Sequence, residues 1–275
     1  MKHKDLLSFY GLKWNPFSPG TPIDGLSLNK KIESFCWRVE SIILDGGYSV
    51  LVGNSGTGKS ITLRFLAHRL EEIKDLNIGI ISRPQSSISD FYRELSDIYS
   101  ISFKNNNRWN SYQSLRKKWL DHLNSGLFRP VLIIDEAQEM SVDVLNEIRL
   151  MSSVSLDSRI VLAVIFSGDL RLLEQLRQPQ LIPLSSRIRV KQLQELASKN
   201  ELELLLTEIL SKAGNATIFN NELIKILADQ AMGNYRSLMI MANTLLQEGV
   251  QREIVQLTEQ HYFEVFDPNQ NKRKK

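Results

Sequence analysis

The chain has 275 residues, 42% of them hydrophobic, which is enough for one large or two modest domains with a buried core. A formal net charge of +3 cannot by itself indicate a nucleic-acid partner, and the apolar runs are too short to span a bilayer. With one cysteine, Cys36, no intrachain disulfide can form, and the N-terminus leads into no hydrophobic signal segment. We therefore expect a cytoplasmic protein without membrane contact.

The N-terminal residues predict an arm that docks on the rest of the chain. Prolines and turn-forming residues within 9–19 favour an irregular path, and the aromatic side chains there require burial. Residues 29–44 then carry apolar side chains at helical spacing, with Cys36 on the apolar face. We therefore interpret Cys36 as a core residue rather than a reactive thiol. Gly46 and Gly47 end this helix before the first strand.

A phosphate-binding loop is the strongest motif of the sequence. The apolar run 48–52 precedes it and an amphipathic run begins at Ile61, so strand, loop and helix follow in the order that the pattern G-x-x-x-x-G-K-[ST] requires. Glycines let successive backbone N–H groups face a phosphate at the positive end of a helix. Lys59 can reach the β- and γ-phosphates of ATP, and the Ser60 hydroxyl can bind Mg²⁺. The predicted nucleotide contacts are Gly53, Asn54, Ser55, Gly56, Thr57, Gly58, Lys59, Ser60 and Ile61.

Strands and helices are predicted to alternate after this loop. Residues 77–82 have the composition of a buried strand, and Ser87 and Asp90 have the spacing of a capping box that starts a helix. The interval 101–108 is polar and irregular, and a further helix is expected over 111–123.

Two acidic residues end the next predicted strand. The aliphatic run 131–134 leads directly into Asp135 and Glu136. A buried parallel strand delivers such carboxylates at its carboxyl edge, where open α/β sheets bind ligands. Asp135 is expected to hold Mg²⁺, and Glu136 to act as the general base on the attacking water. ATP and Mg²⁺ are therefore the expected cofactors.

The rest of the chain divides into strand-containing and helical parts. Ser141 is predicted to cap a helix that extends to about Met151, and 159–166 is predicted as another buried strand. This alternation indicates the α/β class with a doubly wound parallel sheet. From about Val190 no further strand is expected, and helices are predicted over 200–211, 221–231, 237–248 and 258–263. The predicted domains are an arm over 1–28, an α/β nucleotide-binding core over 29–190, a helical lid over 191–265 and a basic tail over 266–275.

These motifs resemble those of the AAA+ ATPases, whose plan combines a phosphate loop, an acidic strand end, a parallel core and a small helical lid. The arm is similar to the start of ExeA-like members, with Phe-Tyr-Gly-Leu at 9–12 and Asn-Pro-Phe-Ser at 15–18. The same branch contains TnsC, TniB and, more distantly, MuB, which regulate DNA transposition. Residues 81–85 followed by 90–95 resemble the corresponding segment of TnsC. The resemblance covers nearly the whole chain.

The resemblance implies three further site residues. Ser167, or its neighbour Gly168, stands where the family has a polar residue, called sensor 1, that positions the attacking water. Arg187, with Arg189 as the competitor, stands where the family has an arginine finger that completes a neighbouring subunit's site. Arg236 stands in the sensor 2 position of the lid, which implies that it reaches the γ-phosphate.

The leading hypothesis from this resemblance is an ATP-dependent regulator of DNA transposition. Such a protein would assemble as a homo-oligomeric ring or filament on duplex DNA, with little sequence preference. It would recruit a transposase, together with a TniQ-like target selector, and disassemble on hydrolysis. The segment between the second strand and the Asp-Glu strand combines basic and aromatic residues, and a solvated helix face over core aromatics is an equal interpretation of it. Its candidate DNA contacts are Lys104, Arg108, Lys117 and Lys118.

Two alternative functions also use the predicted nucleotide site but involve no DNA binding. One is a nucleotide-switched scaffold that binds a protein partner and hydrolyses ATP slowly. The other is an ATPase associated with secretion, as in the ExeA proteins, which carry a membrane anchor and a wall-binding domain. We expect neither of those two features here, which favours the transposition hypothesis.

Overall fold

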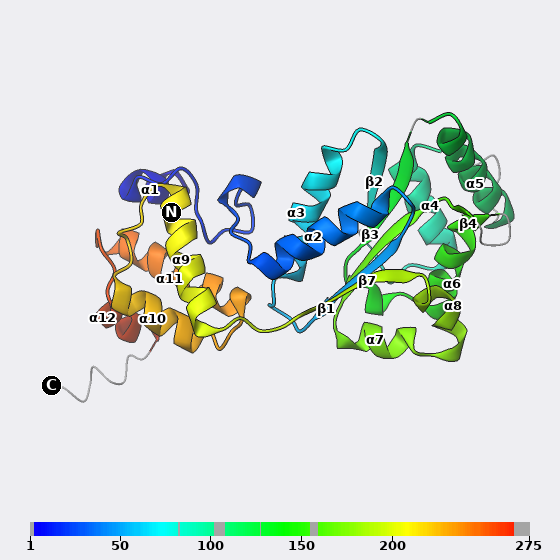
Figure 1. Cartoon of the computed structure of the whole chain (residues 1–275). Coiled ribbons are helices and arrows are strands. Elements are labelled where there is room, and N and C mark those ends of the chain that lie inside the picture. Colours follow the sequence, from blue (N-terminus) through cyan, green and yellow to red (C-terminus); the bar gives the residue numbers. More distant parts are fainter. Residues whose placement is uncertain (1–2, 82, 102–107, 127, 155–158, 267–275) are drawn as a thin grey trace. The chain divides into compact units, whose positions relative to one another are not determined.

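The computed structural model describes residues 3–81, 83–101, 108–126, 128–154 and 159–266, and these form two compact units. One unit, called the sheet unit below, comprises Lys30–Asn54 and Lys59–Gln194. The other, called the helical unit, comprises Met1–Asn29, Ser55–Gly58 and Glu195–Lys275. Both are drawn in Figure 1.

A five-stranded parallel sheet forms the centre of the sheet unit, with the strands in the order β2-β3-β6-β1-β7. The three middle strands are buried almost throughout, because helices cover both faces, and their sequences are accordingly largely apolar. The strands are β1 (Tyr48–Gly53), β2 (Leu76–Ile81), β3 (Arg129–Ile134), β6 (Ala163–Gly168) and β7 (Ile188–Gln194).

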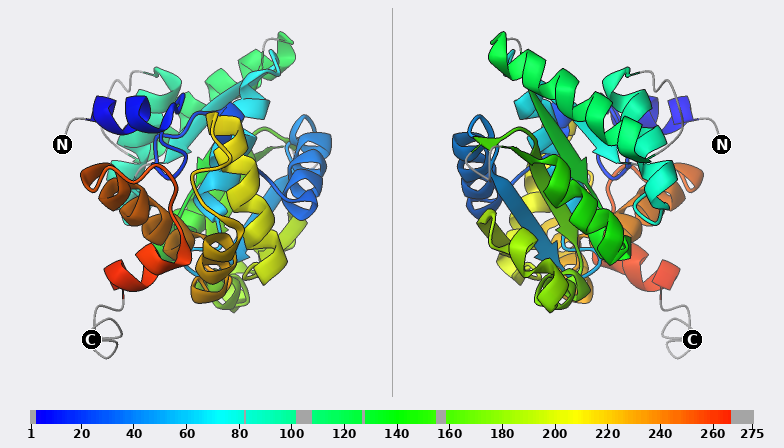
Figure 2. Two further views of the ribbon diagram at one scale, coloured as in Figure 1. Left: turned by 90° about the vertical axis from the view of Figure 1, so that its left-hand side faces the viewer. Right: turned by 90° about the vertical axis from the view of Figure 1, so that its right-hand side faces the viewer.

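Helices pack on the two faces of this sheet, as the alternating pattern predicted (Figure 2). One face carries α2 (Lys30–Ile43) and α3 (Lys59–Glu71), which also contact each other. The other carries α4 (Ile88–Tyr99), α5 (Arg108–Asn124) and α6 (Val142–Met151). Two shorter helices, α7 (Leu170–Leu176) and α8 (Ile182–Ser185), connect β6 to β7. The predicted α/β class with a doubly wound parallel sheet is confirmed.

Two strand predictions are wrong. The apolar run over 159–166 is divided into β5 (Arg159–Ile160), which pairs antiparallel with β4 (Ser153–Val154), and the core strand β6. The break is invisible in the sequence because Val161 and Leu162 between the two strands are also fully buried. Strands also do not stop near Val190, because β7 pairs with β1 up to Gln194. As an edge strand it carries polar residues on its exposed side, which hides its strand character in the sequence.

Local signals for helices are reproduced in the structure. The Ser87 side chain accepts a hydrogen bond from the Asp90 N–H, and Ser141 caps α6 in the same way. Cys36 lies on the apolar face of α2 and is fully buried. Burial raises the pKa of its thiol to about 12, so the interpretation of Cys36 as a core residue is confirmed.

The helical unit has its own hydrophobic core and includes the N-terminal arm. Phe17 stacks on Phe219 with ring centroids 5.6 Å apart, and the Asn15 side-chain amide donates to Asn243 Oδ1 at 2.9 Å. The arm is less irregular than expected, because a short helix continues through Phe9 to its end at Tyr10. The helices of this unit are α1 (His3–Tyr10), α9 (Lys199–Ala213), α10 (Asn221–Gln230), α11 (Tyr235–Gln251) and α12 (Glu259–Phe266). Within the described ranges, no helix has both the length and the apolar character that crossing a bilayer requires.

Candidate functional site

The predicted contacts over residues 53–61 lie on the end of β1, the loop that follows it and the first turn of α3. Gly53 is the last residue of β1, and Lys59 and Ser60 begin α3, with Ile61 exposed in the first turn. Gly56 has φ +81° and Gly58 has φ +93°, a region that residues with a side chain rarely adopt. The loop therefore reverses the chain at the N-terminal end of α3, where the helix dipole and free N–H groups favour an anion.

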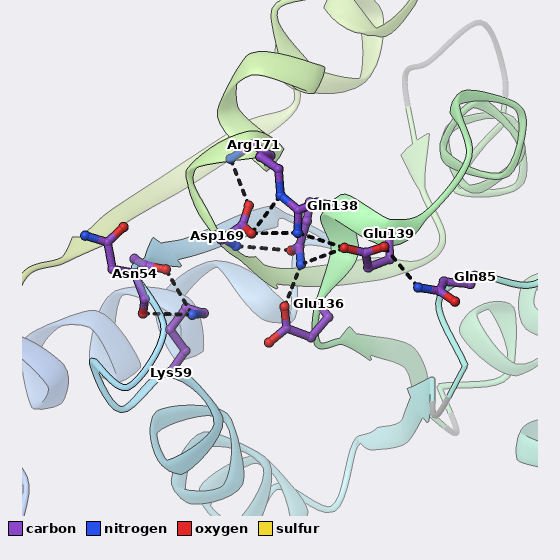
Figure 3. A network of polar contacts seen from close by, with 9 residues as sticks. Asn54, Lys59, Gln85, Glu136, Gln138, Glu139, Asp169 and Arg171 are labelled. Carbon is purple, nitrogen blue, oxygen red and sulfur yellow. Dashed lines mark hydrogen bonds and ion pairs between the residues drawn. The ribbon is translucent and has the colours of Figure 1, made fainter. Parts of the chain in front are cut away.

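The Lys59 side chain lies along this loop. Its ammonium group donates to the carbonyl oxygens of Gly53 at 2.9 Å and Asn54 at 3.1 Å (Figure 3). Only 6% of the residue is exposed. The loop carbonyls thus hold the positive charge at the end of β1.

Asp135 receives hydrogen bonds from hydroxyl groups on two other elements. Ser60 at the start of α3 donates to its Oδ2 at 2.8 Å. Ser167 on β6 donates to its Oδ1 at 2.9 Å and is itself fully buried. The Ser60 hydroxyl and the Asp135 carboxylate are hard oxygen donors placed within contact distance of each other. Mg²⁺ uses one or two such protein ligands alongside substrate phosphates, so the residues present fit this ion.

Glu136 follows Asp135 and is exposed. Its φ of 52° is in the left-handed region, so the chain turns sharply where β3 ends. The Glu136 carboxylate accepts a hydrogen bond from Gln138 Nε2 at 2.5 Å. Gln138 Oε1 accepts one from the backbone N–H of Asp169, the residue after β6, at 3.1 Å (Figure 3). Gln138 thereby connects the predicted general base to the end of a neighbouring strand.

A second set of charged residues surrounds Gln138. The Arg171 guanidinium contacts Asp169 Oδ2 and Glu139 Oε1, both at 2.8 Å. Gln85 donates to the other oxygen of Glu139 at 3.0 Å. The hydrogen bond from Arg171 lowers the pKa of the Asp169 carboxyl, and the hydrogen bonds from Gln85 and Arg171 lower that of Glu139. Both acids are therefore ionised at neutral pH and hold Arg171 in place.

In the helical unit, residues at the N-terminus of α11 form hydrogen bonds with the middle of the phosphate loop. Arg236 Nη1 donates to Ser55 Oγ at 2.9 Å, and Asn234 Nδ2 donates to the Ser55 carbonyl at 3.1 Å. The Tyr235 N–H donates to the Gly56 carbonyl at 2.9 Å. A Cβ at Gly56 would collide with the Asn234 amide, and the φ of +81° is also unfavourable for a residue with a side chain. Both effects exclude a side chain at this position. The predicted sensor 2 residue, Arg236, therefore lies directly on a predicted nucleotide contact.

The two arginine-finger candidates differ in their contacts. Arg187 Nη1 donates to the Arg149 carbonyl at 2.8 Å and to Ser152 Oγ at 3.1 Å. Arg189, two residues along, is exposed on β7. Arg187 is thus held against α6 of its own chain, and it can extend to another subunit only by leaving these acceptors.

The candidate DNA-contacting residues differ in their exposure and in their contacts within the chain, where the structure describes them. Lys104 lies outside the described residues. Arg108 begins α5 and pairs with both carboxylate oxygens of Glu147, a buried acid, which raises the pKa of Arg108. Lys118 donates to the carbonyls of Tyr99 and Ser100 at the end of α4. Lys117 is exposed.

Two residues with prominent contacts were missed by sequence reasoning. Gln138 follows Glu136 by two positions, and this spacing alone carries no pattern for the contact with Asp169. Asn234 could have been found, because an Asn three residues before Ser237 has N-cap spacing, and its side chain does accept the Ser237 N–H.

The sheet order, the glycine loop and the acidic end of β3 define the fold as that of the AAA+ P-loop ATPases. Residues 44–176, slightly less than half of the chain, match the family model described as AAA domain.

Among curated proteins, the chain is similar to General secretion pathway protein A of Aeromonas hydrophila. The two are 28% identical over 185 residues, covering 66% of this chain and 33% of that protein. The chain thus spans about a third of the length of this relative. The match supports the ExeA-like branch expected from the sequence.

Two solved structures share the fold. One is the Aeropyrum pernix ORC2 protein in its ADP form, with a TM-score of 0.72 at 14% identity, covering 90% of this chain and 70% of that one. The other is the Aeropyrum pernix ORC1 protein in complex with DNA, with a TM-score of 0.70 at 15% identity, covering 90% of this chain and 67% of that one.

Proposed function

We propose that the chain is an ATPase that hydrolyses ATP to ADP and phosphate. The observation that carries the proposal is the position of Asp135, whose carboxylate meets the Ser60 hydroxyl at 2.8 Å at the start of the phosphate-loop helix. A metal ligand, a phosphate-binding lysine and a general-base candidate are thus supplied by Asp135, Lys59 and Glu136 at the carboxyl edge of the sheet, after β3 and β1, the two strands that flank β6.

The chemistry follows from these groups. A water oxygen forms a bond to the γ-phosphorus while the bond from that phosphorus to the bridging oxygen of ADP breaks. Glu136 accepts a proton from the water, and the proton passes on to the released phosphate. Lys59 neutralises charge on the β- and γ-phosphates, and Arg236, beside Ser55, does so on the γ-phosphate. Mg²⁺, when bound by Ser60 and Asp135, neutralises further phosphate charge.

The larger role we propose is the regulation of DNA transposition. The chain would form a homo-oligomer on duplex DNA, mark the target for a transposase and a TniQ-like selector, and disassemble on hydrolysis. Arg187 would complete the site of the neighbouring subunit. The resemblance to TnsC and TniB supports this role, as does the fold shared with an ORC1 protein whose structure contains DNA.

The contacts of the basic residues narrow the proposed DNA surface. Arg108 neutralises the buried Glu147, and Lys118 caps the end of α4, so both have partners within the chain. We therefore assign a phosphate contact to the exposed Lys117, and Lys104, which lies outside the described residues, stays a candidate from the sequence. One or two contacts per subunit bind DNA weakly, so tight binding requires ATP-dependent assembly that adds them together.

A second candidate is a secretion-associated ATPase or a nucleotide-switched scaffold that does not bind DNA. The match to General secretion pathway protein A favours it, since that protein is named for secretion. The effect of duplex DNA on ATP hydrolysis, together with DNA binding itself, distinguishes the two candidate functions. In the transposition role, duplex DNA at low salt raises the rate of ATP hydrolysis, and binding measured by fluorescence anisotropy requires ATP. A wild-type protein that hydrolyses ATP but neither binds DNA nor responds to it supports the second candidate instead.

A further inference from the structure

The end of β6 lacks the polar side chain that would face the predicted general base. Ser167 is fully buried and its hydroxyl donates to Asp135, so it is already used to orient the metal ligand. Gly168, the next residue, has no side chain. A Cβ built on Gly168 would collide with Oε1 of Gln138. The Gln138 amide therefore fills the space that a side chain at the end of β6 would take.

The orientation of the Gln138 amide follows from its partners. The backbone N–H of Asp169 can only donate, so the atom facing it at 3.1 Å is the carbonyl oxygen Oε1. The Glu136 carboxylate can only accept when ionised, so the atom facing it at 2.5 Å is the NH₂ group. The reversed amide would place two donors together on one side and two acceptors together on the other.

Gln138 thus links the end of a buried core strand to an exposed side chain. The Asp169 N–H directly follows a core strand, and the Asp169 side chain caps α7 by accepting the Arg171 N–H. Glu136, in contrast, is exposed and lies at a sharp turn after β3. A hydrogen bond from a fixed amide removes rotational freedom from the Glu136 side chain and leaves its remaining oxygen lone pairs available to a water molecule.

We propose that Gln138 is the positioning residue of the general base Glu136, and that position 168 is glycine so that the Gln138 amide can lie there. The proposal rests on the ATPase function proposed above. The family resemblance gives a side chain at the end of β6 the task of keeping the groups that hydrolyse ATP in position. The proposal assigns this task to Gln138. Gln138 acts through Glu136 rather than on the phosphate, so it affects the rate of hydrolysis and not the affinity for ATP.

The first test compares hydrolysis with binding. Gln138→Ala is expected to lower kcat by about 10²-fold, the effect of misplacing a reacting group by about 1 Å. Its Kd for ATP, measured by titration with Mg²⁺ present, should change by less than about twofold, within the scatter of near-neutral contacts. Gln138→Glu, which has the same shape but places a second carboxylate against Glu136, should lose at least as much. Gln175→Ala is the matched control, because it removes an amide that donates to the Met140 carbonyl.

The second test uses double variants, since residues that act as a unit give non-additive losses. In a Glu136→Gln background, Gln138→Ala should cause no further loss of hydrolysis. Gly168→Ala alone should lower kcat, because the added methyl group displaces the Gln138 amide. In a Gln138→Ala background, where that amide is absent, Gly168→Ala should lower kcat little further. Leu172 also lies near the added methyl group, so melting temperatures of all variants are compared.

The outcomes separate the two proposals. A wild-type protein that does not hydrolyse ATP contradicts the proposed function, and the role of Gln138 falls with it. If the wild type hydrolyses ATP and a folded Gln138→Ala variant does so equally well, only the role of Gln138 is wrong. It is also wrong if the losses from Gln138→Ala and Glu136→Gln multiply in the double variant.

Discussion

The Ser60 hydroxyl donates a hydrogen bond to Asp135 at 2.8 Å, joining the first turn of α3 to the end of β3. The other oxygen of the same carboxylate accepts a hydrogen bond from the buried Ser167. Asp135 is therefore oriented from two sides, and one of its two partners is itself a candidate metal ligand. We therefore propose that Ser167 orients Asp135, the proposed metal ligand.

This arrangement predicts a change in metal dependence. Removing a hydrogen-bond partner of a metal ligand typically costs about 10–100-fold in metal affinity or activity. We expect Ser167→Ala to raise the Mg²⁺ concentration that gives half-maximal hydrolysis by such a factor, while nucleotide affinity in EDTA stays unchanged. Hydrolysis is measured across a Mg²⁺ titration, with Ser41→Ala on α2 as a control in the sheet unit. An unaltered Mg²⁺ titration would show that Ser167 does not support the metal site.

The contacts of α11 with the phosphate loop predict two different nucleotide effects. Arg236→Ala should weaken ATP binding more than ADP binding, because the guanidinium is assigned to the γ-phosphate. Asn234→Ser should weaken both alike, by about tenfold, since a lost hydrogen bond of about 1.4 kcal/mol has this effect and the loop backbone serves either nucleotide. Serine keeps the N-cap but is too short to reach the Ser55 carbonyl.

The control for this pair is Asn220→Ser, which changes the N-cap of α10 in the same way away from the loop. Calorimetric titration with ATP and ADP gives the four affinities needed. Equal weakening of ATP and ADP by Arg236→Ala would contradict its assignment to the γ-phosphate.

The proposed arginine finger makes hydrolysis depend on assembly. Arg187→Ala should lower hydrolysis by about 10³-fold or more, as the loss of such a residue does in related chemistry. ATP affinity of the isolated subunit should be nearly unchanged. Arg189→Ala, two residues along on the exposed side of β7, is the control and should retain activity. In the wild type, specific activity should rise with protein concentration, and a constant value across the range of assembly would argue against a shared site.

Lys117→Ala and Arg108→Ala are expected to change different properties, DNA binding in the first case and stability in the second. Lys117→Ala should reduce the salt dependence of DNA binding by about one phosphate contact per subunit without changing stability. Arg108→Ala should instead destabilise the protein by about 1–3 kcal/mol, because it leaves the buried Glu147 carboxylate with one fewer donor. Anisotropy titrations at several salt concentrations and denaturant unfolding measure the two effects. Lys225→Ala, exposed on α10, is the control, and a salt dependence equal to wild type in Lys117→Ala would rule out this surface.

The sequence was sufficient for features that depend on local pattern. Gly53–Ser60, the acids after β3 and the caps at Ser87 and Ser141 were found because each has a fixed spacing with a physical cause. The largely apolar strands of the middle of the sheet were found because burial on both faces favours apolar residues.

What was missed depends on contacts between distant segments. The polar residues of β7 are explained by its edge position, which the sequence does not reveal. The partner of Arg108 is Glu147, 39 residues away, and no local pattern in the sequence indicates that pairing. Gln138 is close to the acidic motif in the sequence, but its proposed role depends on a hydrogen bond from Asp169. Only the folded sheet brings these two residues together.

The central claim is that Lys59 binds the phosphates of ATP and Glu136 drives its hydrolysis, and one comparison of nucleotide retention tests it most directly. Each protein is incubated with radiolabelled ATP and Mg²⁺ and passed rapidly over a desalting column, and the bound nucleotide is identified. We predict no retained nucleotide for Lys59→Ala, because the nearest cation is lost, and ADP or no nucleotide for the wild type. Glu136→Gln should retain intact ATP, because the metal ligand Asp135 remains while the base does not. Conversion of ATP to ADP by Glu136→Gln at the wild-type rate would contradict the account.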